Sequence, residues 1–245
     1  MSFNPDLQYR CTIIRGKSLS RMDDYLPVYA RILSDICPIS STEFNSEFDK
    51  ALQHHIKDDP KTIKNHRTEN VDKLLGMYVV VNGIIYLSER TKKFLSDFDQ
   101  PAFFKSVCYN FQQPNGSQKF LTLKDKIANK INIKPYHFIL ALLKSAQSSD
   151  IKLTKDEISY YVLNSLQVLQ GQVSVGAVLS SILIAREKKI FKRVNIPGKA
   201  YSYSNQHINE QFDYLELANL VRKENNFLIL NVKESEAIDY FIQDL

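Results

Sequence analysis

Two β-branched runs flank Asn82-Gly83 in the segment MYVVVNGIIYLS, residues 77–88. Asn-Gly is the residue pair that best tolerates the positive φ angles of a type I′ turn. The segment therefore predicts a tight β-hairpin. The elements that precede it along the chain then decide which hairpin-containing fold is possible.

Three helices are predicted before this hairpin. Apolar residues recur at helical spacing in three segments, 23–37, 42–56 and 60–75. We expect Thr42 to cap the second helix, and Asp58 or Asp59, followed by Pro60, to begin the third. Three helices and a hairpin form a winged helix-turn-helix, in which the third helix is the recognition helix and the hairpin is the wing.

The same order recurs in the C-terminal half. Pro135 opens an apolar helix, and Thr154 with Glu157 forms a capping box for the next one. Two further helices are expected over 174–188 and 203–220, and Asn225-Asn226 then marks a second hairpin. The residue identity between the two halves is low, so the repeat is one of element order.

The predicted fold is mainly α with small β-hairpin wings (α+β). It contains two winged helix-turn-helix subdomains joined by a linker subdomain. The linker contains two short helices, over 91–98 and 102–111, and a polar stretch over 112–119. The predicted division is an N-terminal arm (1–18), winged-helix subdomain 1 (19–89), the linker (90–134) and winged-helix subdomain 2 (135–245).

Composition excludes several functional classes. Only 7 of the 245 residues are Gly, which disfavours a glycine-rich nucleotide-binding loop. Cys11, Cys37 and Cys108 contain no CxxC spacing, so they predict neither a zinc site nor a disulfide framework. No apolar run is long enough to span a membrane or serve as a secretion signal, and we expect a cytoplasmic protein without metal or cofactor.

The net charge of +5 favours a polyanionic partner. In the first recognition helix, projection at 100° per residue turns Ile63, Val71, Leu74 and Leu75 inward. Bases are usually contacted from the first turns of such a helix. The candidates for base contact are Lys61, Asn65 and His66, and Lys64 on the flank is expected to reach a phosphate. Arg67 projects toward the buried stripe, so both a structural role and a contact to guanine stay open for it.

In the second recognition helix, Ile208, Phe212 and Leu215 are expected to face inward. The first turns provide the second set of DNA-contacting candidates: Tyr203, Ser204, Asn205, Gln206 and His207. Asn and Gln side chains pair well with adenine edges. The preceding basic run, 186–199, contains six cations and one Glu, and we expect Lys192, Arg193 and Lys199 to follow phosphates rather than to form a merely solvated face.

The arm contains Arg10, Arg15 and Lys17 around Gly16. Gly16-Lys17-Ser18 suggests a phosphate loop, but Cys11 occupies the position where that motif needs its first glycine. We expect the two arginines to contact bases and Lys17 a phosphate; plain surface charge is the alternative. Because the arm has no core of its own, deletion of residues 1–10 is expected to change stability little.

No catalytic residue is predicted. A nuclease places an acid-x-Lys string on a strand beside another carboxylate, where the acids hold Mg²⁺. The two such strings, Asp59-Pro60-Lys61 and Glu187-Lys188-Lys189, fall at helix ends instead.

Long blocks of the sequence are similar to a known family. RCTIIRGKS, NHRTENVDKLLGM, DQPAFFKSVCYNFQQPNG, ISYYVLNSLQVLQG and YSYSNQHINEQFDYLELANL resemble the N-terminal DNA-recognition domain of type IIS restriction endonucleases of the BpuJI kind. More distantly, the tandem winged helices are similar to the recognition region of FokI. The resemblance implies two winged-helix subdomains, readout of duplex DNA through both recognition helices and the arm, and a separate C-terminal nuclease domain.

These observations predict a sequence-specific double-stranded-DNA recognition domain of a type IIS restriction endonuclease. It would act as a monomer on an asymmetric site, in a restriction-modification system, beside a nuclease domain in the same chain or in a partner. A free-standing winged-helix transcriptional regulator is the main alternative, and a palindromic footprint would favour it. A protein-interaction scaffold is a third possibility, favoured by loss of DNA affinity at physiological salt.

Overall fold

The structure is a computed structural model that describes residues 3–9, 19–116, 118–194 and 201–245, with only the backbone for 201–208. The chain forms two compact units. We call Ile14–Val107 the N-terminal unit, and Met1–Ile13 together with Cys108–Leu245 the C-terminal unit. Their boundary lies inside a helix of the predicted linker, so the fourfold division predicted from the sequence stays a prediction.

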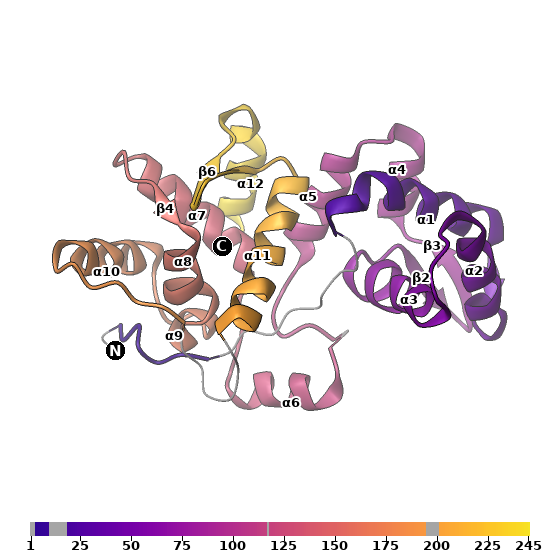
Figure 1. Ribbon diagram of the computed structural model, residues 1–245, viewed down its shortest axis with the longest axis horizontal. Helices are drawn as coiled ribbons and strands as arrows, with labels where there is room; N and C mark the ends of the chain where they lie inside the picture. Colours follow the sequence, from indigo (N-terminus) through magenta and orange to yellow (C-terminus); the bar gives the residue numbers. More distant parts are fainter. Residues whose placement is uncertain (1–2, 10–18, 117, 195–200) are drawn as a thin grey trace. The chain divides into compact units, whose positions relative to one another are not determined.

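The N-terminal unit has the element order of a winged helix (Figure 1). A 3-10 turn, η1 (Leu19–Arg21), leads into α1. The elements that follow are α1 (Met22–Ile36), β1 (Ile39–Ser40), α2 (Ser41–His55), α3 (Pro60–Asn65), η2 (His66–Leu74), β2 (Tyr78–Val81), β3 (Ile84–Leu87), α4 (Glu89–Asp97) and α5 (Gln100–Asn110). The π-helix η2 continues directly from α3, so the two together correspond to the predicted third helix.

The predicted first hairpin is confirmed. β2 pairs antiparallel with β3, which places Tyr78 opposite Leu87 and Val81 opposite Ile84. At the turn, Asn82 and Gly83 have φ angles of 50° and 79°, as a type I′ turn requires. β1 pairs with the other edge of β3, and the sheet order is β1-β3-β2.

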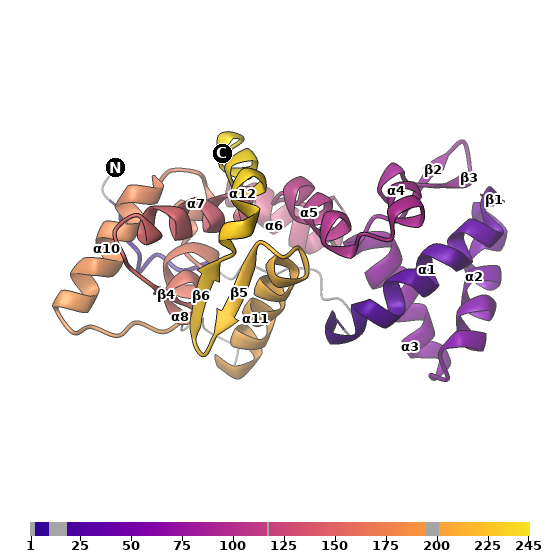
Figure 2. The ribbon, with the colours of Figure 1, turned by 90° about the horizontal axis from the view of Figure 1, so that it is seen from above.

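The C-terminal unit repeats this plan with an insertion. Its elements are α6 (Phe120–Ala128), α7 (Pro135–Gln147), β4 (Leu153–Thr154), α8 (Lys155–Ile158), the π-helix η3 (Ser159–Leu163), α9 (Leu166–Leu169), α10 (Val175–Glu187), α11 (Tyr201–Leu217), β5 (Val221–Glu224), β6 (Phe227–Leu230), η4 (Val232–Glu234) and α12 (Ser235–Gln243). The sheet order β4-β6-β5 is the order of the first sheet. Figure 2 shows β5 and β6 beside α11, which contacts β5.

The predicted fold class is therefore correct: the chain is mainly helical, with two small antiparallel sheets of winged-helix topology. In each unit a short strand before the helix-turn-helix pairs with the second strand of the hairpin. α9 and α10 separate the two helices of the second motif. The recognition helices are thus α3 with η2 in one unit and α11 in the other.

Two local predictions differ from the structure. The cap of α2 is Ser40, whose hydroxyl accepts from the backbone N–H of Thr42 at 3.3 Å, because β1 keeps Ser40 extended until the helix begins. Helix α6 was not predicted. Its Phe120 and Leu121 are 74% and 77% exposed, so its apolar residues do not form the buried stripe that marks a helix in a sequence.

The N-terminal segment also differs from the prediction. Residues 4–9, which we call the strap, lie against η3 and α9 instead of standing apart from the core. The backbone N–H of Tyr9 donates to the carbonyl of Asn164 at 2.8 Å, and that of Leu166 donates to the carbonyl of Leu7 at 2.8 Å. The strap is therefore part of the packed fold, contrary to the premise of the predicted deletion, and the effect of deleting residues 1–10 on stability stays a prediction.

Candidate nucleic-acid interface

The N-terminal turns of α3 carry exposed polar side chains at the predicted positions. Asp59 caps the helix by accepting from the backbone N–H groups of Lys61 at 2.9 Å and Thr62 at 3.1 Å. Hydrogen bonds from Thr62 and Lys61 hold the pKa of Asp59 below its ordinary value, so the cap stays ionised. Lys61 and Lys64 are exposed and Asn65 is half-buried. These three side chains are accessible to a ligand.

His66 does not face outward, and its predicted orientation is wrong. The residue is 0% exposed. Its Nδ1 forms a short hydrogen bond with the hydroxyl of Tyr29 on α1, and the ring packs edge-on against Tyr25 with centroids 5.1 Å apart. The Asn70 side chain donates to the same Tyr29 hydroxyl at 3.0 Å. His66 therefore belongs to a polar cluster in the core between α1 and the recognition helix.

Arg67 takes the structural role that the sequence left open. It is 9% exposed. Its Nε donates to Oδ1 of Asp49 at 2.7 Å and its Nη2 to Oδ2 at 3.1 Å, while Nη1 donates to Asn45 at 2.5 Å. Both partner residues, Asp49 and Asn45, lie on α2, so the guanidinium joins the two helices of the helix-turn-helix instead of facing a guanine.

The burial of His66 and the structural role of Arg67 have the same cause. The buried residues of the helix are Ile63, His66, Arg67, Asn70, Val71 and Leu74, which follow the i, i+3, i+4 spacing of one helical face. The prediction already projected Arg67 toward this face but otherwise counted only apolar residues as inward-facing. Helical spacing alone would also have assigned His66 and Asn70 to the buried face, and their polar partners could then be sought on neighbouring helices.

The second recognition helix is present where it was predicted. Phe212 and Leu215 are fully buried, as expected. The DNA-contacting candidates Tyr203, Ser204, Asn205, Gln206 and His207 lie in the first two turns of α11, and their side chains lie outside the described part of the chain.

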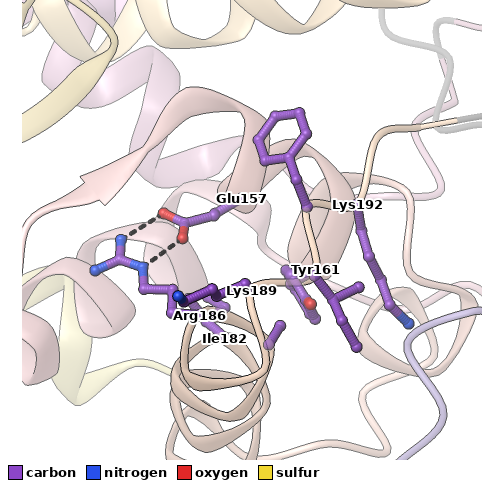
Figure 3. Close-up of a pocket in the computed structure, with 9 residues that line it drawn as sticks. Glu157, Tyr161, Ile182, Arg186, Lys189 and Lys192 are labelled. Carbon is purple, nitrogen blue, oxygen red and sulfur yellow. Dashed lines mark hydrogen bonds and ion pairs between the residues drawn. The ribbon is translucent and has the colours of Figure 1, made fainter.

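Part of the basic run before α11 forms contacts within the fold. Arg186 donates from Nε and Nη2 to the two carboxylate oxygens of Glu157, at 2.6 and 2.7 Å, as Figure 3 shows. Burial alone would raise the pKa of Glu157, but the hydrogen bonds from Arg186 and Thr154 lower it. Thr154 and Glu157 also form the predicted capping box of α8. Arg186 is therefore a structural residue.

Lys192 and Arg193 differ in exposure. The Lys192 ammonium lies 2.5 Å from Oδ1 of Asp6, whereas Arg193 is exposed, with its guanidinium 5.1 Å from the ring centroid of Phe191. Lys192 and Phe191 line a cavity of about 230 Å³ with Glu157, Tyr161, Ile182, Ala185, Arg186, Lys189 and Ile190 (Figure 3). Lys199 lies outside the described residues, as do Arg10, Arg15 and Lys17.

The hairpins offer few cations for phosphate contact. The first has no Lys or Arg between Gly76 and Ser88. In the second, Lys223 pairs with Asp213 and with Glu216, the latter at 2.6 Å, and Arg222 pairs with Glu224 at 3.0 Å. Of the predicted phosphate contacts, Lys64 on α3 and Arg193 in the basic run are exposed.

Within the described ranges, no three His, Cys, Asp or Glu residues are grouped closely enough to hold a metal ion. Of the two acid-x-Lys strings, one contains Asp59, whose carboxylate caps α3, and the other ends α10. The same ranges contain no helix that is both long enough and apolar enough to cross a lipid bilayer.

The model of one protein family, described as the N-terminal part of restriction endonuclease BpuJI, matches residues 3–245. The chain belongs to this family. A solved structure of the BpuJ1 endonuclease binding domain in complex with pyrene- and phenanthrene-modified DNA is 46% identical, covers 99% of this chain and 88% of that chain, and superposes with a TM-score of 0.95. The curated proteins include no match.

Membership in the BpuJI N-terminal family confirms the resemblance drawn from the sequence blocks. At this identity and coverage the two domains have the same fold. Which side chains contact a ligand is a separate question. The geometry removes His66 and Arg67 from the accessible candidates and leaves Lys61, Lys64 and Asn65 on the first recognition helix.

Proposed function

We propose that this chain is a sequence-specific double-stranded-DNA recognition domain of a type IIS restriction endonuclease. The observation that supports this best is the likeness, over 99% of the chain and at 46% identity, to a binding domain solved with DNA. The accessible Lys61, Lys64 and Asn65 at the start of α3 add a chemical reason, because Lys binds phosphate and Asn pairs with adenine edges.

The two winged helices carry different residues at the starts of α3 and α11. Two different recognition helices on one chain can contact a site without two-fold symmetry, whereas a symmetric dimer needs a palindrome. We therefore infer a monomer on an asymmetric site, with the nuclease activity supplied by another domain of the same chain or by a partner. A cytoplasmic location is part of this proposal.

Selection from a random duplex library in the presence of EDTA tests the proposal. We expect one non-palindromic site, bound by one chain, with a specific-to-nonspecific affinity ratio on the order of 10³ or more. A palindromic site bound by two chains would support a transcriptional regulator instead. Enrichment of no sequence, or binding only with Mg²⁺, would contradict the proposal.

A further inference from the structure

The strap is attached to the C-terminal unit by side chains as well as by its backbone. Oδ1 of Asp6 accepts from the Lys192 ammonium at 2.5 Å, and the Tyr160 hydroxyl donates to the same oxygen. The Lys192 nitrogen lies 5.7 Å from the centroid of the Tyr160 ring. One carboxylate therefore joins three segments that are far apart in the sequence: the strap, η3 and the basic run.

The surrounding contacts orient the strap around Asp6. The Gln8 side chain donates to the carbonyl of Tyr160 at 3.1 Å, and the backbone N–H of Asn4 donates to the side chain of Gln167 at 2.6 Å. The Tyr9 hydroxyl donates to Asp125 at 2.5 Å. Contacts on both sides of Asp6 thus restrict the direction in which the strap runs across η3.

Asp6 is 61% exposed along its side chain and Lys192 is 24% exposed. An isolated ion pair of this exposure contributes little to stability. The hydrogen bonds from Lys192 and Tyr160 nevertheless hold the pKa of Asp6 below its ordinary value, so the carboxylate is ionised at neutral pH. The pair is not isolated, because Tyr160 donates to the same oxygen, and together the two contacts restrict where the strap and the basic run lie.

We propose that Asp6 is a positioning residue for DNA recognition, holding the strap and the basic run together on Tyr160. The strap ends at Tyr9, directly before Arg10, and Lys192 directly precedes Arg193 in the run that leads to α11. The strap and the basic run, which each lead along the chain to candidate DNA contacts, are thus both held by the Asp6 carboxylate. The inference rests on the proposed function and adds a residue that contacts no DNA itself.

The test compares the full wild-type chain with Asp6→Asn on the selected site and on random duplex. Asp6→Asn keeps the size of the side chain and removes the charge that holds Lys192. We expect its specific-to-nonspecific ratio to fall about twofold to thirtyfold. Asp239→Asn is the matched control, because it removes a similarly exposed carboxylate, 45% exposed and paired with Lys144, and its ratio should equal that of the wild type.

Hydrogen exchange gives a second measurement that needs no DNA. The amides of Tyr9 and Leu166 form the bonds between the strap and the segment 164–166, and we expect both to exchange faster in Asp6→Asn than in Asp239→Asn. Tyr160→Phe removes the other donor to Asp6 and should change exchange and discrimination in the same direction.

Three results would overturn the inference. A selected site with unchanged discrimination in Asp6→Asn would show that the strap position does not matter for recognition. Tighter binding of all sequences by Asp6→Asn would show that Asp6 competes with phosphate for Lys192. Unchanged exchange at Tyr9 and Leu166 would show that Asp6 does not hold the strap. A wild-type chain that selects no site would contradict the proposed function itself, a result distinct from these three.

Discussion

Arg67 of the recognition helix and Asp49 of α2 share a two-point ion pair, with N–O distances of 2.7 and 3.1 Å. The side chain of Arg67 is 11% exposed and that of Asp49 31%. A guanidinium matches a carboxylate in this geometry because its N–H groups form a planar fork. The pair holds the first helix of the helix-turn-helix at a defined angle to the second.

Arg67→Ala is expected to lower the free energy of unfolding by about 1.5–3 kcal/mol, because it leaves Asp49 and Asn45 without their charged donor. Arg67→Lys should recover only part of this, since an ammonium cannot donate along the fork. Denaturant unfolding measures the loss. Lys64→Ala, on the exposed side of the same helix, is the control and should stay within about 0.5 kcal/mol of the wild type. Equal stability of Arg67→Ala and Lys64→Ala would contradict the structural role.

The buried hydroxyl of Tyr29 should make the stability of the protein depend on pH in the alkaline range. Burial raises the pKa of its hydroxyl above the ordinary value of 10.0. The folded state therefore holds this proton more tightly than the unfolded state, and the associated stability is present below about pH 10 and is lost as the pH rises further.

Tyr29→Phe should cost about 1–3 kcal/mol at neutral pH, because His66 and Asn70 lose their shared partner. As the pH is raised above about 10, the stability of this variant should fall less than that of the wild type, since the variant has one fewer buried hydroxyl to ionise. Thermal unfolding across this range measures both effects. Tyr86→Phe, at a residue that is 42% exposed, is the control; a wild-type alkaline slope in Tyr29→Phe would refute the assignment.

For Glu157 we predict the opposite pH dependence of stability, with a loss at acid pH. Its pKa is lowered from the ordinary value of 4.5 despite burial, because Arg186 and Thr154 donate to the carboxylate. The stability it contributes is therefore present above about pH 4.5 and is lost as the pH falls through the folded-state pKa. Glu157→Gln should cost about 1–3 kcal/mol at pH 7. The difference from the wild type should shrink below about pH 4.5; a difference that persists in acid would contradict the role of the charge.

On the accessible side of α3, Asn65→Ala and Lys64→Ala should have different effects on DNA binding. Asn65→Ala is expected to cost about 1–3 kcal/mol on the selected site and little on random duplex. Lys64→Ala should weaken binding to both and reduce the salt slope by roughly 0.9 if one phosphate contact is lost. Salt titrations of the two variants on both duplexes measure these effects. Specificity lost in Lys64→Ala and kept in Asn65→Ala would reverse the two assignments.

For His66, stability has to be measured before DNA binding, unlike for Asn65 and Lys64. Because it is buried against Tyr29 and Tyr25, His66→Ala should first lower stability by about 2–4 kcal/mol, through lost packing and the loss of one of the two hydrogen bonds of the Tyr29 hydroxyl. Circular dichroism with thermal unfolding checks this. A fully stable His66→Ala variant that has lost only site discrimination would restore the direct contact predicted from the sequence.

The sequence by itself determined the parts of this protein that depend on near neighbours along the chain. Asn82-Gly83 specified the first hairpin because its two residues accept positive φ angles, and Thr154 with Glu157 specified a helix start because both groups of a capping box lie within one turn. The order of helices and hairpins followed from these local signals, and so did the winged-helix topology of each unit.

Only the tertiary structure decided which polar side chains the core uses. His66 lies 37 positions from Tyr29, Arg67 lies 18 from Asp49, and Lys192 lies 186 from Asp6. No spacing rule relates residues so far apart, because their partners are set by how helices and strap pack in space. A basic or polar residue near a recognition helix therefore has the same sequence signature whether it contacts DNA or a carboxylate of its own chain.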